Sequence, residues 1–428
     1  MMIEEISPLK GRRLLVAACG SIAAVKTPIL VSNLIKAGAE VRCVVTPSAS
    51  RLVSPVSLAT LSRNRCYQDE DQWSSKEARP LHIALAEWAE IVVIAPLSAS
   101  SLSRWSQGLA DGLLASLLVA CECPVIASPA MNTGMWANKA VQKNWAAIKD
   151  NPKVMALSPS SGLLACDRLG DGRMVDPEFI QLSIAHCLVN KSKDEVLKSD
   201  WRGKRLLVTS GPTIEALDPA RQMTNRSSGL MGVMLAQAAK CRGAEVDLIH
   251  GPLQLPHSWL EGLKTHPVKS SIEMQTTLTK LQPSADAIAM AAAVTDLRKK
   301  GGPISKKISK EALLASISQE FEVVPDLLAE IASGRPKDQA ILGFAALTGN
   351  DIELEQLGRK KMQSKGCDLL MANPIDRIGQ GFEENANGGI LLGPEGMVKP
   401  MLVTSKLALA HQLLDALIGL KPNFSKKN

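Results

Sequence analysis

Aromatic side chains are scarce in this sequence, which has one Tyr, five Phe and seven Trp among 428 residues. Its net charge of +7 is modest for that length, and no basic run is interleaved with aromatic residues. Proteins that bind single-stranded nucleic acids stack the bases on aromatic side chains within a basic groove. We therefore expect no nucleic-acid partner, and we expect the surplus Lys and Arg residues to bind phosphorylated small molecules.

The usual phosphate-binding and zinc-binding motifs are also missing. The chain has no GxxxxGK run followed by Ser or Thr, and neither glycine turn that follows a predicted strand has GxGxxG spacing. A P-loop and a standard dinucleotide fingerprint are therefore not predicted. The nine Cys residues include no paired CxxC units, and Cys121 and Cys123 are too close together for a zinc knuckle. The sequence alone leaves any metal ligands unknown.

No apolar run is long and uninterrupted enough to predict a membrane span. The most apolar stretch, Leu113–Ala130, contains Glu122 and Pro124, so we interpret it as core. The odd number of Cys residues and the lack of an apolar N-terminal segment favour reduced thiols. We therefore expect a cytoplasmic protein with no membrane partner.

The length predicts two domains, and one pattern occurs twice along the chain. In each half an apolar strand leads into a Gly turn and a helix, after which Gly-Ala-Glu-Val opens the next strand, at Gly38 and again at Gly243. This order predicts an α/β protein with two doubly wound, mostly parallel-sheet domains. We expect them to span 1–189 and 203–428, with the polar stretch 190–202 as a linker.

The stretch Val208–Gly232, VTSGPTIEALDPARQMTNRSSGLMG, contains the first candidate site. Its Ser227-Ser228-Gly229 turn opens an apolar helix, whose free N–H groups and dipole suit an anion such as a phosphate. Asn225, Arg221 and Arg226 lie nearby and supply further hydrogen-bond donors. The turn alone is typical of an ordinary strand–helix loop, but two such turns framing Asn and Arg favour a ligand site.

Three further candidates lie in the N-terminal half. His82 precedes the apolar strand Ile91–Pro96, Asn132 follows the strand Pro124–Ser128, and Cys166 lies in a Gly-rich polar loop. Taken singly, they are an ordinary structural His, a turn Asn and a core Cys. Ligands bind at the carboxyl ends of parallel strands, however, which makes Asn132 well placed.

These residues and their neighbours resemble the flavin-dependent Cys decarboxylase family. The matching motifs are the turn GSIAAVK, the His of LHIAL, the Asn of PAMN and the Cys of ACDRLGDGRM. The resemblance implies a flavodoxin-like domain that binds FMN. The residues it implies for that cofactor are Gly20, Ser21 and Ile22 at the phosphate, with further contacts at Thr46 and Ser98.

The resemblance also implies a role for each catalytic residue. Oxidation of a cysteinyl side chain to a thioaldehyde makes loss of carbon dioxide easy, with Asn132 holding the carboxylate and His82 assisting. Cys166 would then give a proton as the enethiol is reduced. Cys19, Val25 and Asp167 depart from the family pattern, and Ser98-Ala-Ser100 replaces a Thr-Ala-Asn/Asp run. The hydroxyl at Ser98 is retained, so we expect FMN to bind.

The C-terminal half resembles a nucleotide-dependent ligase. Its GPTIEALDPARQMTNRSSGLMG run matches the ligase half of the bifunctional phosphopantothenoylcysteine decarboxylase/phosphopantothenate–cysteine ligase family, and later motifs follow in the same order. The resemblance implies a Rossmann-like domain in which Asn225 holds an acyl-nucleotide and Lys307 activates it. The nucleotide-binding residues it implies are Asp296, Lys307, Pro325, Asp326, Leu327, Leu328, Phe344, Lys361 and Lys365.

Some ligase assignments stay open. Spacing from Arg298 selects Lys306 rather than Lys307 as the activating residue. Leu297, Ser309, Val324 and Leu347 depart from the family motifs.

Together the two resemblances imply one bifunctional enzyme of coenzyme A synthesis. The second domain would activate 4′-phosphopantothenate with CTP and Mg²⁺ as an acyl-cytidylate and join it to cysteine, and the first would decarboxylate the product to 4′-phosphopantetheine. They also imply a homo-oligomer, with trimeric decarboxylase and dimeric ligase domains. A flavin carrier with a nucleotide sensor would leave His82, Asn132, Cys166 and Asn225 unexplained. A flavin prenyltransferase would need neither the Cys loop nor the ligase half.

Overall fold

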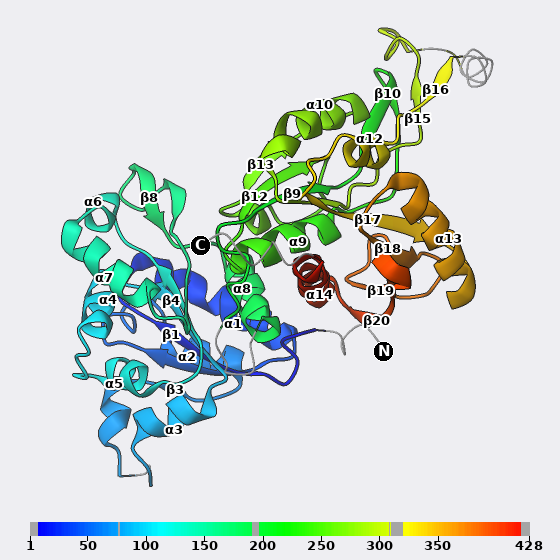
Figure 1. The fold of residues 1–428 in the computed structure, drawn as a ribbon. Coiled ribbons are helices and arrows are strands. Elements are labelled where there is room, and N and C mark those ends of the chain that lie inside the picture. The colour runs from blue at the N-terminus through cyan, green and yellow to red at the C-terminus, as the bar shows by residue number, and fades with distance from the viewer. Residues whose placement is uncertain (1–6, 76–77, 191–196, 308, 310–319, 421–428) are drawn as a thin grey trace. The chain divides into compact units, whose positions relative to one another are not determined.

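The structure is a computed structural model that describes residues 7–75, 78–190, 197–307, 309 and 320–420 (Figure 1). The chain divides into two compact units, one ending at Lys198 and the other beginning at Ser199. This division lies within the predicted linker 190–202, of which residues 191–196 lie outside the described part.

The first unit is built on one parallel sheet of six strands in the order β3-β2-β1-β4-β5-β6. The strands are β1 (Arg13–Ala18), β2 (Glu40–Val45), β3 (Cys66–Tyr67), β4 (Ile91–Leu97), β5 (Val125–Pro129) and β6 (Val154–Ala156). The strand order reverses between β1 and β4, so the sheet is doubly wound as predicted. Every residue of β4 is buried, as expected for a central strand covered on both faces.

Helices cover both faces of this sheet. One face packs against α1 (Thr27–Lys36), α2 (Pro55–Ser62) and α8 (Pro177–Val189). The other packs against α3 (Leu81–Trp88), α4 (Ala99–Ser106), α5 (Leu113–Ala120) and α7 (Lys139–Lys149). The short helix α6 (Thr133–Trp136) follows β5, and a separate hairpin joins β7 (Ser160–Leu163) to β8 (Leu169–Arg173).

The second unit has an eight-stranded sheet in the order β13-β12-β9-β14-β17-β18-β19-β20. Its strands are β9 (Arg205–Ser210), β12 (Glu245–His250), β13 (Lys264–Pro267), β14 (Ala287–Met290), β17 (Ala340–Leu347), β18 (Leu369–Pro374), β19 (Ala386–Leu392) and β20 (Val398–Ser405). The first six in spatial order are parallel, whereas β19 and β20 run antiparallel to their neighbours. The predicted mostly parallel, doubly wound sheet is confirmed.

Two groups of helices flank this sheet. Helices α9 (Leu230–Cys241) and α14 (Lys406–Gly419) pack against each other, side by side in Figure 1. Helices α10 (Ser271–Leu281), α12 (Leu327–Ser333) and α13 (Asp351–Lys365) share a separate apolar core with the sheet. Two small antiparallel ribbons complete the unit, β10 (Ile214–Asp218) with β11 (Arg221–Thr224) and β15 (Leu297–Lys299) with β16 (Phe321–Val323).

An ion-pair cluster around one buried arginine ties the start of the second unit to α14. The guanidinium of Arg242, which is fully buried, donates to both carboxylate oxygens of Asp200, at 2.8 and 2.5 Å, and lies 2.7 Å from Asp415 in α14. Trp201 is also fully buried. Residues just before β9 are therefore part of the packed structure of this unit.

Candidate active sites

The first unit has a cavity of about 360 Å³ at the carboxyl ends of β1, β2 and β4. Three of the residues predicted to bind FMN line it: Gly20 after β1, Thr46 after β2 and Ser98 after β4. This is the point where the strand order reverses, which is where doubly wound sheets bind ligands. Ser21 and Ile22 do not line the cavity but begin the short helix that follows Gly20.

Backbone and hydroxyl groups shape the wall of this cavity nearest β1. A Cβ at Gly20 would lie 2.4 Å from the Cβ of Ser48, so only glycine allows the two turns to approach this closely. Ser98 caps α4, and its Oγ accepts a hydrogen bond from the Ser101 amide at 3.3 Å. Cys19, which replaces a family Ser, is fully buried, and burial raises the pKa of its thiol.

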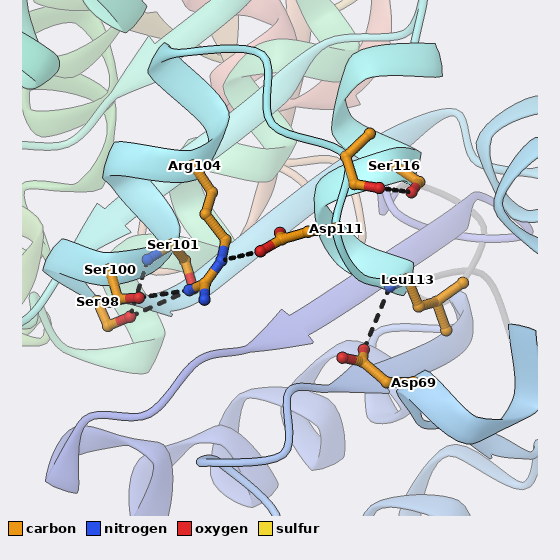
Figure 2. Close-up of polar contacts among 9 residues, drawn as sticks. Asp69, Ser98, Ser100, Ser101, Arg104, Asp111, Leu113 and Ser116 are labelled. Carbon is orange, nitrogen blue, oxygen red and sulfur yellow. Dashed lines mark hydrogen bonds and ion pairs between the residues drawn. The ribbon is translucent and has the colours of Figure 1, made fainter.

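Figure 2 shows charged side chains that line the same cavity, Arg104, Asp111 and Asp69. The sequence did not point to these three residues. Arg104 of α4 donates to Asp111 at 3.0 Å and also contacts the Ser100 hydroxyl. Asp69 accepts a hydrogen bond from the amide of Leu113, the first residue of α5, at 3.2 Å. Burial raises the pKa of the Asp69 carboxyl. An Arg and a set of hydroxyls beside a Gly turn suit a phosphorylated ligand.

Asn132 and Cys166 are brought together although 34 residues separate them. Asn132 caps α6: its Oδ1 accepts from the Gly134 amide at 2.8 Å, and its Nδ2 donates to the Cys166 Sγ at 3.1 Å. Cys166 is exposed in the turn between β7 and β8. The hairpin is held to the residue before Asn132, because the Met131 amide donates to the carbonyl of Gly172 at 2.9 Å.

His82 is the second residue of α3 and does not line the 360 Å³ cavity. Its Nδ1 is buried and has no hydrogen-bond partner among the described residues. No hydrogen bond joins it to Asn132 or Cys166 in the described part of one chain. A buried imidazole nitrogen without a partner is a group that a ligand or another copy of the chain could satisfy.

The second unit has a larger cavity of about 550 Å³, also at the carboxyl edge of its sheet. Eight predicted nucleotide-binding residues and the predicted acyl-nucleotide residue line it: Asp296, Pro325, Asp326, Leu327, Leu328, Phe344, Lys361, Lys365 and Asn225. They come from segments spread over 141 positions of the chain, from 225 to 365. The fold thus gathers these residues into one site.

Contacts among these residues fix part of the site. The Asn225 Nδ2 donates to the carbonyl of Val294 at 2.8 Å, which joins the end of the β10–β11 ribbon to the segment after β14. Asp326 caps α12 by accepting from the Ala329 amide at 3.2 Å, and it pairs with Lys365 of α13 at 3.1 Å. A carboxylate and an ammonium from two different helices therefore share one edge of the cavity.

The predicted activating lysine is not part of this cavity. Lys306 and Lys307 are both exposed, and neither lines the cavity in the described chain. They follow β15, which pairs with β16 as a separate ribbon, and the Ile304 amide donates to the carbonyl of Leu217 at 2.9 Å. The choice between Lys306 and Lys307 stays a prediction.

Sequence reasoning assigned no role to the cavity residues that follow Lys365. These are Asn373, Ile375, Gly381, Phe382, Glu383, Asn387 and Lys406. Glu383 accepts hydrogen bonds from the Arg226 guanidinium at 3.1 and 2.6 Å, which joins two loops at the cavity rim. Of these, Asn373 lies in Ala372-Asn-Pro374, a stretch that resembles one of the later motifs of the ligase family.

Among the described residues no group of three or more His, Cys, Asp or Glu side chains is arranged to hold a metal ion. None of their helices is both long and apolar enough to cross a membrane.

Comparison with known proteins assigns a family to each unit. Residues 2–189 match the family model described as Flavoprotein, and residues 201–420 match the one described as DNA/pantothenate metabolism flavoprotein C-terminal domain. The chain is 33% identical over 424 residues to the coenzyme A biosynthesis bifunctional protein CoaBC of Bacillus subtilis, covering 98% of this chain and all of that protein. The CoaBC proteins of Vibrio parahaemolyticus and Escherichia coli K12 are 35% and 33% identical, over 95% and 96% of this chain and 98% and 97% of theirs. The chain therefore belongs to the family of bifunctional coenzyme A biosynthesis proteins CoaBC.

Proposed function

We propose that this chain catalyses two consecutive steps of coenzyme A synthesis. The second unit activates 4′-phosphopantothenate with CTP and joins the acyl group to cysteine, and the first unit decarboxylates the product to 4′-phosphopantetheine. The observation that carries the proposal is the clustering of nine predicted ligase residues around one 550 Å³ cavity. The hydrogen-bonded pair Asn132–Cys166, in a unit with its own cavity, supports the second activity.

The residues of the first cavity fit FMN. Gly20 permits a close backbone approach, Thr46 and Ser98 offer hydroxyls, and Arg104 offers a cation for the phosphate. We assign the phosphate turn to Gly20 together with Ser21 and Ile22. Bound FMN would supply the oxidising and reducing equivalents of this decarboxylation.

The chain's own side chains orient the substrate and move its protons. The Nδ2 group of Asn132, which donates to Cys166 Sγ in this structure, can instead donate to the departing carboxylate and hold it. Cys166 is exposed, and its Sγ lies 3.1 Å from that nitrogen. Its thiol can therefore give a proton to the enethiol that remains after carbon dioxide has left. His82, whose Nδ1 is buried without a partner in the described chain, is assigned to assist the oxidative decarboxylation.

In the ligase unit the chemical need is a better leaving group on the acid. A carboxylate oxygen attacks the α-phosphorus of CTP, pyrophosphate leaves, and an acyl-cytidylate results. The amine of cysteine then attacks the acyl carbon, and CMP leaves. Lys361 and Lys365 line the cavity and can balance the phosphate charge, and Lys307 is assigned the activating role once it reaches the nucleotide.

Mg²⁺ is part of this proposal as the ion that accompanies the nucleotide. Asp296 and Asp326 both line the cavity, and carboxylate oxygens together with phosphate oxygens are its usual ligands. Asn225 is assigned to the acyl-cytidylate, because its carboxamide is already oriented by Val294. The proposal also includes a cytoplasmic homo-oligomer with trimeric decarboxylase and dimeric ligase units.

The test uses the purified full chain with 4′-phosphopantothenate, cysteine, nucleotide and Mg²⁺. With CTP we expect pyrophosphate release and, by mass spectrometry, phosphopantothenoylcysteine; adding FMN should convert it to 4′-phosphopantetheine with release of carbon dioxide. ATP and GTP in place of CTP test the base preference. A chain that consumes no nucleotide with any of them would contradict the ligase assignment, and one that binds no FMN would contradict the decarboxylase assignment.

A further inference from the structure

The ligase cavity contains a buried ammonium that no assigned role explains. Lys406 is the first residue of α14, lines the cavity and is 5% exposed. Its Nζ donates to the carbonyl of Gly381 at 2.9 Å, and its backbone amide donates to the carbonyl of Asn385 at 3.0 Å. An ammonium has three donors, so Nζ retains hydrogen-bonding capacity beyond the Gly381 carbonyl.

The charge of Lys406 is not balanced by an ion pair. Among the described residues no carboxylate lies within 4.0 Å of its Nζ, whereas Lys365, which lines the same cavity, pairs with Asp326 at 3.1 Å. Burial lowers the pKa of Lys406 to about 8, although Glu384 acts in the opposite direction. Burying an unpaired charge is costly unless a ligand compensates it. An anion in the cavity would provide that compensation.

A second buried polar group that lines this cavity is also incompletely satisfied. Asn373 is 7% exposed, and its Oδ1 is buried without a hydrogen-bond partner among the described residues. The Ser227-Ser228-Gly229 turn, where α9 begins, lines the cavity too, and its Ser227 and Ser228 hydroxyls accept from the Gly229 and Leu230 amides at 3.3 and 3.4 Å. A buried ammonium and a buried carboxamide oxygen, both with unused hydrogen-bonding capacity in one cavity, indicate a ligand subsite.

The position of Lys406 separates it from the proposed nucleotide lysines. Lys406 begins α14, which packs on α9, whereas Lys361 and Lys365 lie on α13, which belongs to the apolar core shared with α10 and α12. The cavity therefore receives positive charge from both helix groups. The reaction joins two anionic substrates, and the carboxyl end of the acid must meet the nucleotide. The phosphate at the other end of the acid is then left for the α9–α14 side.

We propose that Lys406 is a specificity-determining residue whose ammonium neutralises the phosphate of the acid substrate. It thereby selects the phosphorylated acid over the same acid without phosphate. The inference rests on the proposed ligase function and adds to it the residue that binds the phosphate of the acid.

The test compares 4′-phosphopantothenate with pantothenate in the full-length enzyme. Ligase activity is followed as pyrophosphate release with CTP, Mg²⁺ and cysteine, for the parent, Lys406→Met, Lys406→Gln and Lys406→Arg. The Gln variant keeps a donor for the Gly381 carbonyl but removes the charge, which separates charge from loop anchoring. Lys399→Met, at an exposed position of β20, is the matched control.

We expect Met and Gln to raise KM for 4′-phosphopantothenate by about 100-fold, the scale of one lost buried charge contact, while KM for CTP changes less than about threefold. Their preference for the phosphorylated acid should fall by a similar factor, and Arg should restore most of it. The Lys399 variant should match the parent.

Two results would overturn the assignment. If the Met and Gln variants keep the parent preference, or lose affinity for CTP and not for the acid, Lys406 does not read this phosphate. If Met unfolds while Gln folds and keeps the parent preference, Lys406 only anchors the Gly381 loop. Inactivity of the parent enzyme would instead contradict the proposed function, so the two failures are distinguishable.

Discussion

A single methyl group at Gly172 should test how the decarboxylase site is assembled. Gly172 lies in β8 with a φ of +132°, a backbone conformation that L-residues rarely adopt. A Cβ there would lie 2.2 Å from the carbonyl oxygen of Met131. Ordinary contact between these atoms needs about 3.3 Å, so Gly172→Ala must separate β8 from the Met131 backbone by about 1 Å.

The separation should disconnect Cys166 from Asn132. The β7–β8 hairpin is held beside Asn132 by the bond from the Met131 amide to the Gly172 carbonyl, at 2.9 Å, and the Asn132–Cys166 contact is 3.1 Å. A displacement of about 1 Å at a reacting group can cost about 100-fold in rate. We therefore expect Gly172→Ala to reduce decarboxylation by about that factor.

The assay measures carbon dioxide release from phosphopantothenoylcysteine in the full chain loaded with FMN. Pyrophosphate release by the ligase unit of the same chain is the internal control and should not change, because the two units are separate compact bodies. Leu169→Ala, a position of β8 that is 81% exposed, is the matched control variant. Decarboxylation at the parent rate by a folded Gly172→Ala enzyme would refute the role of hairpin docking.

The remaining predictions concern both activities, the core and the domain boundary. Cys166→Ser should bind FMN and release carbon dioxide once, yet fail to reach saturated product, because a hydroxyl is a far weaker acid than a thiol. Stopped-flow flavin absorbance with mass analysis of the bound product measures this. Repeated turnover at the parent rate would contradict the role of Cys166 as proton donor. Asn225→Asp should activate the acid but accumulate acyl-nucleotide, because a carboxylate beside an anionic intermediate repels it; normal ligation would remove Asn225 from the site. Arg242→Met should lower the free energy of unfolding of the second unit by about 1.5–3 kcal/mol, because it removes the buried guanidinium that bonds Asp200 and Asp415; denaturant titration measures the change. Cutting the chain between Lys198 and Ser199 should give two folded, separately active pieces. A C-terminal piece that begins at Gly203 should melt at a lower temperature than one that begins at Ser199, because it lacks the buried Trp201. Thermal unfolding of the two C-terminal pieces measures the difference.

The sequence was informative wherever a ligand loop directly follows a strand. Gly20, Thr46 and Ser98 each come just after a predicted strand, and such loops meet at one edge of a parallel sheet. The family resemblance named these residues, and the strand pattern explains why they meet in one cavity. The same logic located Asn132, which follows β5.

Residues that reach a site by packing between distant segments could not be found in this way. Lys406 has the pattern of a solvated first-turn residue of an amphipathic helix, yet it is buried and its Nζ donates to the carbonyl of Gly381, a residue from a distant loop. Asp69 lies in a short acidic run that is typical of a solvated loop, yet it caps the first turn of α5. The Asn132–Cys166 contact depends on a hairpin docking that no local pattern encodes.

The absence of a P-loop motif from the sequence agrees with how cations are placed in the two cavities. A P-loop gathers its donors in one short segment of chain, so it can be recognised from a few consecutive residues. Here Arg104 lines the first cavity, and the second receives Lys361 and Lys365 from α13 and Lys406 from α14, two helices that meet only in the folded unit. The phosphate recognition that we propose for the second cavity would therefore depend on tertiary packing. Variants that loosen the packing around these cations should weaken binding of phosphorylated ligands before they unfold the unit that contains them.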